Sequence, residues 1–458
     1  MRNRVVGFTV LLALAGLVSA FTFPGSLGQN PPQPLPAKLP AIDVAPPYDK
    51  SSPIRPVTGT SETATSKQVV AARPAVAFDR FRNLESLNAS TRQMVMTALM
   101  GMEWLHRYHQ PNGLFLHGYI PALNQTLEGD HFLHQARAAL ALSRSARFTG
   151  EDRFTARANQ AVLTLLSVTS VDPTVPGMRK PAQPSIVCNR LEAAGLLALA
   201  IYELPDPPAD LIAKAEELVA FIRQTQLPDG SFRYVDAATD PVDAGGINQH
   251  PGPALCALAM SQRLRPQPAK ADAARRAVSF YRKWFREHAD PNFVPWMTAA
   301  CTEAFLGSRE NVYAEFAFEM NDWLCGLQYT EAPDPRRLHW RGGFRSYSQG
   351  KIDAAAPDID AAMYARSLAD VCRMIRQMPT PDLQRYDRYR SALLRSLQFV
   401  ASLQYTESNT LHFSDPYRPK LVGGFHPNHA DGNLRVDQSA AAVSAFVQFL
   451  VSGADKTQ

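Results

Sequence analysis

A short motif that recurs four times constrains the fold of this sequence more than any other feature. Two copies, at residues 327–344 and 403–425, each contain Leu-Gln-Tyr-Thr-Glu followed, after a polar loop, by Gly-Gly-Phe. Looser copies at residues 104–115 and 221–232 keep the same order of aromatic residue, helix end, glutamine, turn, glycine and aromatic residue. A motif that returns in this way indicates one supersecondary unit used repeatedly.

The repeats fall within a regular series of predicted helices. Apolar residues recur at helical spacing in twelve segments: residues 91–108, 130–148, 151–167, 186–204, 209–226, 249–265, 271–288, 294–306, 311–328, 359–377, 382–404 and 435–451. In each consecutive pair the first segment is amphipathic, whereas the second is rich in alanine and apolar on most faces, which is typical of a helix buried on all sides.

Half-exposed helices that alternate with fully buried ones are what a closed ring of two layers requires. We therefore predict an all-α fold, an α/α toroid of six helical hairpins over residues 78–458. An open solenoid of stacked hairpins is the alternative. The uniformly apolar second helices argue against it, because a solenoid would expose them on its concave face.

The N-terminal 77 residues have a different composition. Residues 1–20 begin with Arg2 and Arg4, continue with an apolar run and end in small residues, which is typical of a secretory signal peptide and too short to span a bilayer readily. Residues 21–77 are rich in proline, serine and threonine and are predicted to be a disordered linker. We expect an exported protein, periplasmic or extracellular, with a membrane tether only if the N-terminus stays uncleaved.

Charge and cysteine content exclude other classes of function. The formal net charge is +5 without a dense basic run, so no nucleic-acid partner is expected. The cysteines are far apart and lie in apolar helical patterns, which predicts buried small side chains rather than a disulfide framework: Cys188, Cys256, Cys301, Cys325 and Cys372. No spacing typical of cofactor or metal ligands is found, and none is predicted.

Six hairpins with long glycine-rich loops between their helices resemble the six-hairpin glycosidases. That resemblance extends to polysaccharide lyases and sugar epimerases and, more distantly, to terpenoid cyclases and prenyltransferases. Residues 135–154, Gln-Ala-Arg-Ala-Ala-Leu-Ala-Leu-Ser-Arg-Ser-Ala-Arg-Phe-Thr-Gly-Glu-Asp-Arg-Phe, are similar to a hairpin corner of carbohydrate-active toroids. The aromatic-Gln-Gly-aromatic repeat is similar to a motif of squalene and prenyl toroids. The resemblance covers nearly the whole chain beyond Phe78 and implies a carbohydrate, or another small-molecule or polymer ligand.

In a toroid of this layout, the long loops and the first turns of the inner helices meet at one end of the ring, where the helix dipoles are positive. Functional residues are expected there. On the first hairpin these positions are His131, His134 and Arg137. Glycoside hydrolysis needs two carboxyl groups, and the predicted catalytic residues are Glu192, Asp243, Asp358, Asp360 and Asp437, with His250 as a further base. The predicted substrate-binding residues are Arg190, Asn248, Trp296, Trp340, Phe344, Tyr364, Phe425 and His426. Trp296, Trp340, Phe344 and Phe425 are expected to stack on sugar rings.

Structural roles are the alternative for several of these residues. Asp358 follows a proline and could cap the next helix. Ion pairs are the alternative for three acids: Glu192 with Arg190, Asp360 with Arg366, and Asp437 with Arg435.

Three other functions remain open at this point. Lyase or epimerase chemistry needs a base and groups that neutralise a carboxylate, for which Arg190, Asn248, His250 and Tyr364 are suited. A glycan-binding or scaffold toroid would need no catalytic pair. Terpenoid cyclisation is less favoured, because Asp358-Ile-Asp360-Ala-Ala lacks the last aspartate of the Asp-x-Asp-Asp motif of those enzymes.

Overall fold

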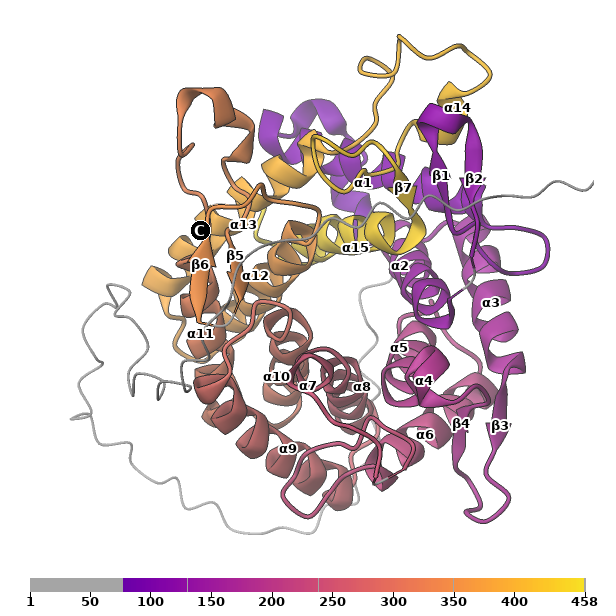
Figure 1. Ribbon diagram of the computed structural model, residues 1–458. Helices are drawn as coiled ribbons and strands as arrows, with labels where there is room; N and C mark the ends of the chain where they lie inside the picture. The colour runs from indigo at the N-terminus through magenta and orange to yellow at the C-terminus, as the bar shows by residue number, and fades with distance from the viewer. Residues whose placement is uncertain (1–76, 130, 238, 349, 457–458) are drawn as a thin grey trace, which may run out of the picture. The chain divides into compact units, whose positions relative to one another are not determined.

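A ring of six inner helices is the centre of the fold (Figure 1). The computed structural model describes residues 77–129, 131–237, 239–348 and 350–456, all within one unit, Arg55–Gln458. In this part of the chain the inner helices are α2 (Phe132–Thr149), α5 (Arg190–Tyr202), α8 (Pro251–Leu264), α10 (Val294–Ser308), α12 (Ala361–Arg376) and α15 (Val436–Ser452). Each packs against the next, and α15 closes the ring against α2.

Six outer helices surround this ring. They are α1 (Ala89–Tyr108), α3 (Asp152–Ser167), α6 (Ala209–Gln224), α9 (Pro268–Glu287), α11 (Asn311–Cys325) and α13 (Leu383–Ser402). Every residue of α5 from Leu191 to Tyr202 is buried, whereas α9 buries only one side. The predicted toroid and its pairing of amphipathic outer helices with apolar inner helices are confirmed.

Two predicted inner helices begin with a separate short helix. The segment predicted at residues 186–204 divides into α4 (Ser185–Cys188) and α5, whereas the segment predicted at residues 249–265 corresponds to α8, and α7 (Ala244–Gln249) precedes it. Asn189, between α4 and α5, has a left-handed φ of 41° and accepts a hydrogen bond from the backbone N–H of Glu192, which starts a new helix. Pro251 occupies the first turn of α8, where its missing N–H costs nothing.

Short strands in the loops were not predicted. β1 (Gly118–Ile120) pairs antiparallel with β2 (Gln125–Leu127) and with β7 (Leu434–Arg435), so the loops before α2 and α15 are joined. Two hairpins pair β3 (Thr169–Val171) with β4 (Arg179–Pro181) and β5 (Ser346–Ser348) with β6 (Lys351–Asp353). The remaining short helices are η1 (Ala77–Phe81), η2 (Leu84–Ser86), η3 (Pro121–Leu123), η4 (Pro335–Trp340) and α14 (Arg418–Leu421). Strands of two or three residues have too little alternation to be seen in a sequence.

The fourfold motif fastens each hairpin to the next outer helix. In the last copy, Gln404 Nε2 donates hydrogen bonds to the carbonyls of Gly423 (3.1 Å) and of Thr97 in α1 (3.0 Å). Gly423 has φ +97°, and a Cβ there would lie 2.2 Å from the Met100 carbonyl oxygen. Only glycine permits that conformation and approach. Because α1 is the first helix of the outer layer and α13 is the last, this copy closes the ring.

The other copies repeat the arrangement. Gln226 and Gln328 each bond a loop glycine and a carbonyl of the following outer helix. In the first copy, at residues 104–115, His109 takes the glutamine position and pairs with the aromatic residue Phe115. The motif had suggested the next residue, Gln110, for this position.

The predicted signal peptide (residues 1–20) and, except for Ala77, the predicted linker (21–77) lie outside the described residues. Within the described part, no helix has the length and apolarity needed to span a bilayer. All five cysteines are unbonded, and four of them are buried, as expected for small core side chains.

Candidate functional site

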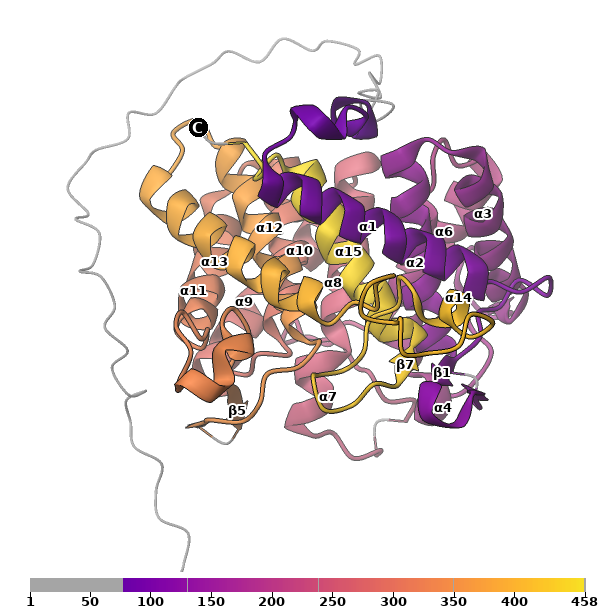
Figure 2. The same ribbon diagram turned by 90° about the horizontal axis from the view of Figure 1, so that it is seen from above.

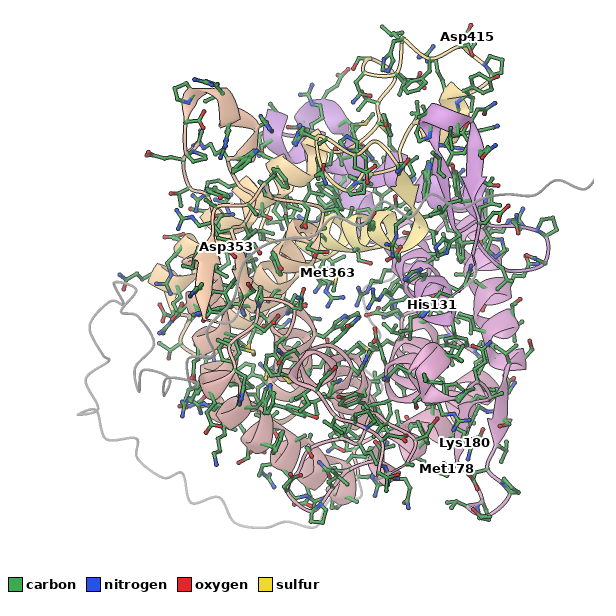
Figure 3. All side chains as sticks on the ribbon, viewed as in Figure 1. His131, Met178, Lys180, Asp353, Met363 and Asp415 are labelled. Carbon is green, nitrogen blue, oxygen red and sulfur yellow. The ribbon has the colours of Figure 1, made fainter. Side chains whose placement is uncertain are left out.

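The loops that lead into the inner helices lie at one end of the ring. Figure 2 shows β1, β5, β7, α4 and α7 along the same edge. In the view down the ring, His131 lies on the α2 side of the interior and Met363 on the α12 side (Figure 3). The polar residues that start the inner helices therefore gather at this end, which we call the loop face.

Arg137, on α2, is at the centre of the loop-face cluster. Its Nη2 donates to Glu192 Oε1 at 2.7 Å. The charges of Asp437 and Asp360 also act on this guanidinium. Four inner helices, α2, α5, α12 and α15, thus contribute one interacting group each.

Glu192 is fully buried, and both of its oxygens are in use. Oε1 accepts from Arg137, and Oε2 lies 2.7 Å from His250 Nδ1. Burial alone would raise the pKa of Glu192, but the charge of Arg137 and the hydrogen bond with His250 hold it below the ordinary value. Glu192 is therefore an ionised anchor for Arg137 and His250, and it has 0 % of its side chain exposed for contact with a substrate.

Asp437 is a second ionised carboxylate at the loop face. Arg435 Nε and Nη2 donate to its two oxygens at 3.1 and 3.0 Å, so the predicted pairing of these two residues is confirmed. Burial raises the pKa of Asp437, but His134 and Arg435 hold it below its ordinary value. Because burial lowers the pKa of His134 itself to about 4, Arg435 and, to a smaller extent, Arg137 supply the positive charge beside Asp437 at neutral pH.

Asp360 has the opposite electrostatic environment. It keeps solvent-exposed surface, yet surrounding protein raises its pKa to about 6 by desolvation, and the charges of Asp358 and Asp437 contribute to the rise. Among the described residues no donor bonds its carboxyl oxygens, and the predicted pairing with Arg366 is wrong, since Arg366 lies further along α12 over Trp296.

Asp358 and Tyr364 flank this carboxyl. Asp358 Oδ1 accepts from the backbone N–H of Asp360 at 3.0 Å, so it stabilises the turn before α12 and does not cap the helix itself. The Tyr364 ring packs edge-on against Phe344. Burial, followed by the charges of Asp360 and Asp358, raises the pKa of the Tyr364 phenol far above its ordinary value, so the hydroxyl is a neutral donor.

Three histidines form a stack beside Asp437. The His134 ring lies 4.7 Å from that of His131 and 5.1 Å from that of His117. The Nδ1 atom of each is buried without a hydrogen-bond partner in the described part of the chain. His117 was missed in the sequence, because it precedes a short strand and no helical pattern marks it.

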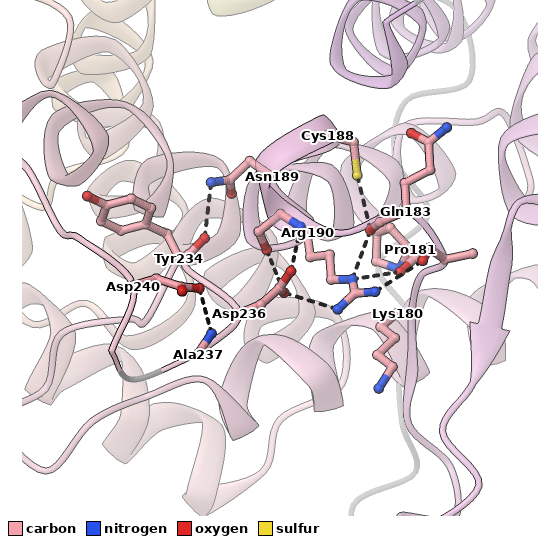
Figure 4. Close-up of polar contacts among 12 residues, drawn as sticks. Lys180, Pro181, Gln183, Cys188, Asn189, Arg190, Tyr234, Asp236, Ala237 and Asp240 are labelled. Carbon is pink, nitrogen blue, oxygen red and sulfur yellow. Dashed lines mark hydrogen bonds and ion pairs between the residues drawn. The ribbon is translucent and has the colours of Figure 1, made fainter.

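Arg190 is bound to the loops around α5 and not to the cluster (Figure 4). Its guanidinium donates to the carbonyls of Pro181, Ala182 and Gln183 and pairs with Asp236 at 3.0 Å. The predicted Arg190–Glu192 ion pair is therefore wrong. Arg190 lines a separate shallow pocket of about 200 Å³ near Lys180.

Asp243 and Asn248 have structural partners. The Asp243 carboxylate caps α7 by accepting from the Gly246 backbone N–H at 2.6 Å. Asn248 Oδ1 accepts from Trp284 Nε1 at 2.8 Å. Both hydrogen bonds fix the α7 segment that precedes His250.

The predicted stacking aromatics are largely core residues. Phe425 is 0 % exposed and stacks on Phe446, so a sugar has no access to its ring. Phe344 and Trp340 are also buried. Burial of these rings corrects the expectation that they stack on sugars, which came from the motif's position next to glycine loops.

Two other predicted binding residues have protein partners. The Trp296 ring is buried and covered by the Arg366 guanidinium at 3.7 Å. His426 Nδ1 lies 2.7 Å from the Asn428 carbonyl oxygen, and burial lowers its pKa. Among the described residues, no group of three or more His, Cys, Asp or Glu side chains is placed to hold a metal ion.

Known structures identify the fold of this chain. An inactive variant of the α-1,6-mannanase GH76A of Salegentibacter sp. HEL1_6, solved with α-1,6-mannotriose, aligns over 78% of this chain and 99% of its own, with TM-score 0.55 and 12% identity. The chain has the six-hairpin (α/α)6 toroid fold. Other toroids that align are an unsaturated glucuronyl hydrolase specific for heparin (TM-score 0.52, 12% identity, 78% and 96% covered) and a D-mannose isomerase (0.56, 12%, 80% and 99%). No protein-family model and no curated protein sequence match.

Proposed function

We propose that this toroid hydrolyses a glycosidic bond, with Asp360 as general acid and Asp437 as general base or nucleophile. The observation that carries the proposal is that the pKa values of two carboxyl groups at the starts of adjacent inner helices are shifted in opposite directions. The pKa of Asp360 is raised to about 6, whereas that of Asp437 is held low. Two carboxyl groups with pKa values pushed apart are what acid–base catalysis at a glycosidic bond requires.

Each group has a defined task in this reaction. Protonated Asp360 donates its proton to the leaving oxygen as the glycosidic bond breaks. Asp437, fixed by Arg435, either activates a water or attacks the anomeric carbon, and its negative charge stabilises the positive charge that develops on the sugar ring. The Arg137–Glu192 ion pair joins α2, which carries His134, to α5, and the contact of Glu192 with His250 joins α5 to the start of α8.

Similar toroids support a carbohydrate substrate. The mannanase and the glucuronyl hydrolase act on glycosides, and exchange of two adjacent aspartates for asparagine gives an inactive mannanase variant. Asp358 and Asp360 are likewise aspartates close in sequence. The ligand class is therefore proposed as an oligo- or polysaccharide.

Proton transfer at a sugar carbon is the second candidate, because of the histidine stack. His134 has a pKa lowered to about 4 and is a neutral base at pH 7, and a D-mannose isomerase shares the fold. The base and carboxylate-binding set first considered is not assembled, since Arg190 and Asn248 have structural partners.

We also propose export. The basic start, apolar run and small residues of residues 1–20 support cleavage by a signal peptidase. N-terminal sequencing of the protein from a bacterial culture tests this. A mature chain that begins shortly after Ala20 is expected, and an intact Met1 in the cytoplasmic fraction would contradict it.

The function is tested with the purified protein on a panel of neutral and acidic oligosaccharides. New reducing ends, absorbance of unsaturated products and sugar isomers are recorded together. New reducing ends that disappear in Asp360→Asn and Asp437→Asn, but not in Asp382→Asn at the cap of outer helix α13, are expected. Isomers without new reducing ends would favour the histidine stack, and unsaturated products would mean lyase chemistry. Binding without any product would mean a glycan-binding toroid.

A further inference from the structure

An arginine lies beneath the loop-face carboxyls without a partner for its donors. Arg366 follows Asp360 by six residues on α12, which places it about 9 Å deeper along the helix axis. Its side chain is buried at 2 % exposure, and its guanidinium lies 3.7 Å from the centre of the Trp296 ring. Nε and Nη2 have no hydrogen-bond acceptor among the described residues.

A second arginine, on the inner helix α2, also has donors without a hydrogen-bond acceptor in the described part of the chain, although it is partly exposed and ion-paired. Arg144 follows Arg137 by seven residues on α2, so it lies on the same helix face two turns deeper. Its Nε and Nη1 lack a hydrogen-bond acceptor in the described part, and Glu203 Oε1 is 4.0 Å from its Nε. Burial and the charge of Arg144 lower the pKa of Arg366 to about 9, so the two cations repel each other.

The acids at this depth are bound to other groups. Glu303 accepts from Arg263 Nε and Arg373 Nη2, both at 2.6 Å. Asp370 accepts from Gln448 at 2.5 Å, and burial raises its pKa. Arg366 is therefore a buried cation that these acids do not neutralise by a direct bond, whereas Arg144 is partly exposed and has Glu203 as its ion-pair partner. Such an arrangement costs stability unless a further anion binds there.

We propose that Arg366 and Arg144 bind an anionic group of the substrate, so that the protein acts on an acidic sugar. Carboxylate, sulfate and phosphate share the chemistry that guanidinium groups recognise through paired N–H donors. One sugar unit with its charged substituent can reach from the level of Asp360 to the level of Arg366. The placement of that sugar rests on the proposed function, since it assumes that the reacting bond lies at Asp360 and Asp437.

A neutral sugar leaves the unbonded donors of Arg366 and Arg144 without an acceptor. The proposal therefore predicts that acidic sugars bind more tightly than neutral ones. A site built around charged donors discriminates strongly against a ligand that lacks the matching group. The sequence shows these arginines in pairs that are seven residues apart on helices otherwise apolar: Arg137 with Arg144, and Arg366 with Arg373.

The first test measures binding by calorimetry with the full chain. The probes are methyl glucuronide, glucose 6-phosphate, glucose 6-sulfate, methyl glucoside and inorganic sulfate. At least tenfold tighter binding of one or more acidic sugars than of methyl glucoside is expected, and their order identifies the oxyanion. Equal binding of acidic and neutral sugars would overturn the proposal. So would binding of inorganic sulfate as tight as that of the acidic sugars, because the site would then hold a simple ion.

Variants test whether the two arginines cause the preference for acidic sugars. Arg366→Met and Arg144→Met are each expected to abolish the preference for the acidic sugar while binding of methyl glucoside persists. Arg385→Met, on outer helix α13, is the matched control. A preference that survives in both variants would contradict the proposal. If Arg366→Met does not fold, Arg144→Met and the selectivity of the wild type decide the question.

The result separates this inference from the proposed function. Hydrolysis that requires Asp360 but prefers neutral glycosides would overturn the anion site and leave the hydrolase. Arginine-dependent binding of acidic sugars without hydrolysis would support the anion site and reject the hydrolase.

Discussion

Asp360 and Asp437 lie at the starts of α12 and α15, two inner helices that pack against each other, and the negative charge of Asp437 adds to the rise in the pKa of Asp360 that burial and the charge of Asp358 cause. Arg435 holds Asp437 ionised, so the same arrangement keeps one carboxyl charged and favours the proton on the other. Titration of these groups is coupled, and the pH dependence of activity reports on the pair.

Removing the charge of Asp358 is expected to shift the alkaline limit of activity. Asp360 must be protonated to act, so kcat/KM falls as pH rises through about 6. The Asp358→Asn variant removes a like charge, lowers the pKa of Asp360 and moves this limb to lower pH by roughly half a unit to one unit. The asparagine oxygen can still accept from the Asp360 backbone N–H. A pH–rate profile measures the shift, and an unmoved or higher limb would speak against Asp360 as the acid.

Removing Arg435 is expected to shift the acid limit. Asp437 must be ionised, and without the Arg435 guanidinium its pKa rises because the effect of burial is offset less. Arg435→Gln should therefore move the acid limb of kcat/KM to higher pH by about one unit or more. Arg385→Gln, which loses ion pairs on an outer helix, should leave the profile unchanged. If the acid limb of kcat/KM lies at the same pH in Arg435→Gln and in Arg385→Gln, Asp437 is not the titrating base.

Glu192→Gln is expected to reduce stability more than a surface change does. The substitution leaves Arg137 with a weaker partner inside the ring, which costs about 3 kcal/mol at pH 7. Because the folded pKa of Glu192 is depressed, its contribution is present above the unfolded pKa of about 4.3 and is lost as pH falls toward the folded value. Thermal unfolding should show a Tm gap to the wild type at pH 7 that narrows in acid. A gap that is absent at pH 7, or constant with pH, would refute the role of this ion pair.

The repeat predicts a contrast between two glycines. A Cβ on Gly342 (φ +92°) would lie 2.1 Å from the Arg395 carbonyl oxygen, whereas Gly177 (φ +77°) has open space around it. Gly177→Ala should cost only the left-handed backbone penalty, about 1 kcal/mol. Gly342→Ala should cost more than twice as much, because α13 must move. If a denaturant titration shows the same loss of unfolding free energy in Gly342→Ala and Gly177→Ala, the motif does not fasten the hairpins.

Most of the fold follows from local patterns in the sequence. Each helix is long enough for its apolar spacing to be recognised. Helices that bury one side, such as α9, alternate with helices that are buried on all sides, such as α5, and this alternation specifies two layers. The glycines of the motif are visible because their conformation excludes other residues. The strands β1 and β7 are not visible, because residues more than 300 positions apart pair there.

The site was only partly predictable, because its members meet in three dimensions. The start of an inner helix predicted that Asp360, Asp437 and Arg137 lie at the loop face, but it could not separate them from Arg190, whose side chain turns to the loops. Aromatic residues beside glycine suggested sugar stacking, whereas tertiary packing buries Phe425 completely. The pKa difference between the two aspartates depends on Arg435 and on desolvation, and neither can be read from spacing.

The most direct test of the central claim compares the wild type with Asp360→Asn on two substrates that share a sugar and differ in leaving group. An unactivated glycoside needs a proton on its leaving oxygen, whereas a nitrophenyl glycoside does not. The account predicts that Asp360→Asn lowers kcat/KM for the unactivated glycoside by a factor of about 10² to 10⁴. It should lower the value for the nitrophenyl glycoside far less, with the alkaline limb near pH 6 absent. Equal losses on both substrates, or no loss on either, would contradict the assignment of Asp360 as the proton donor.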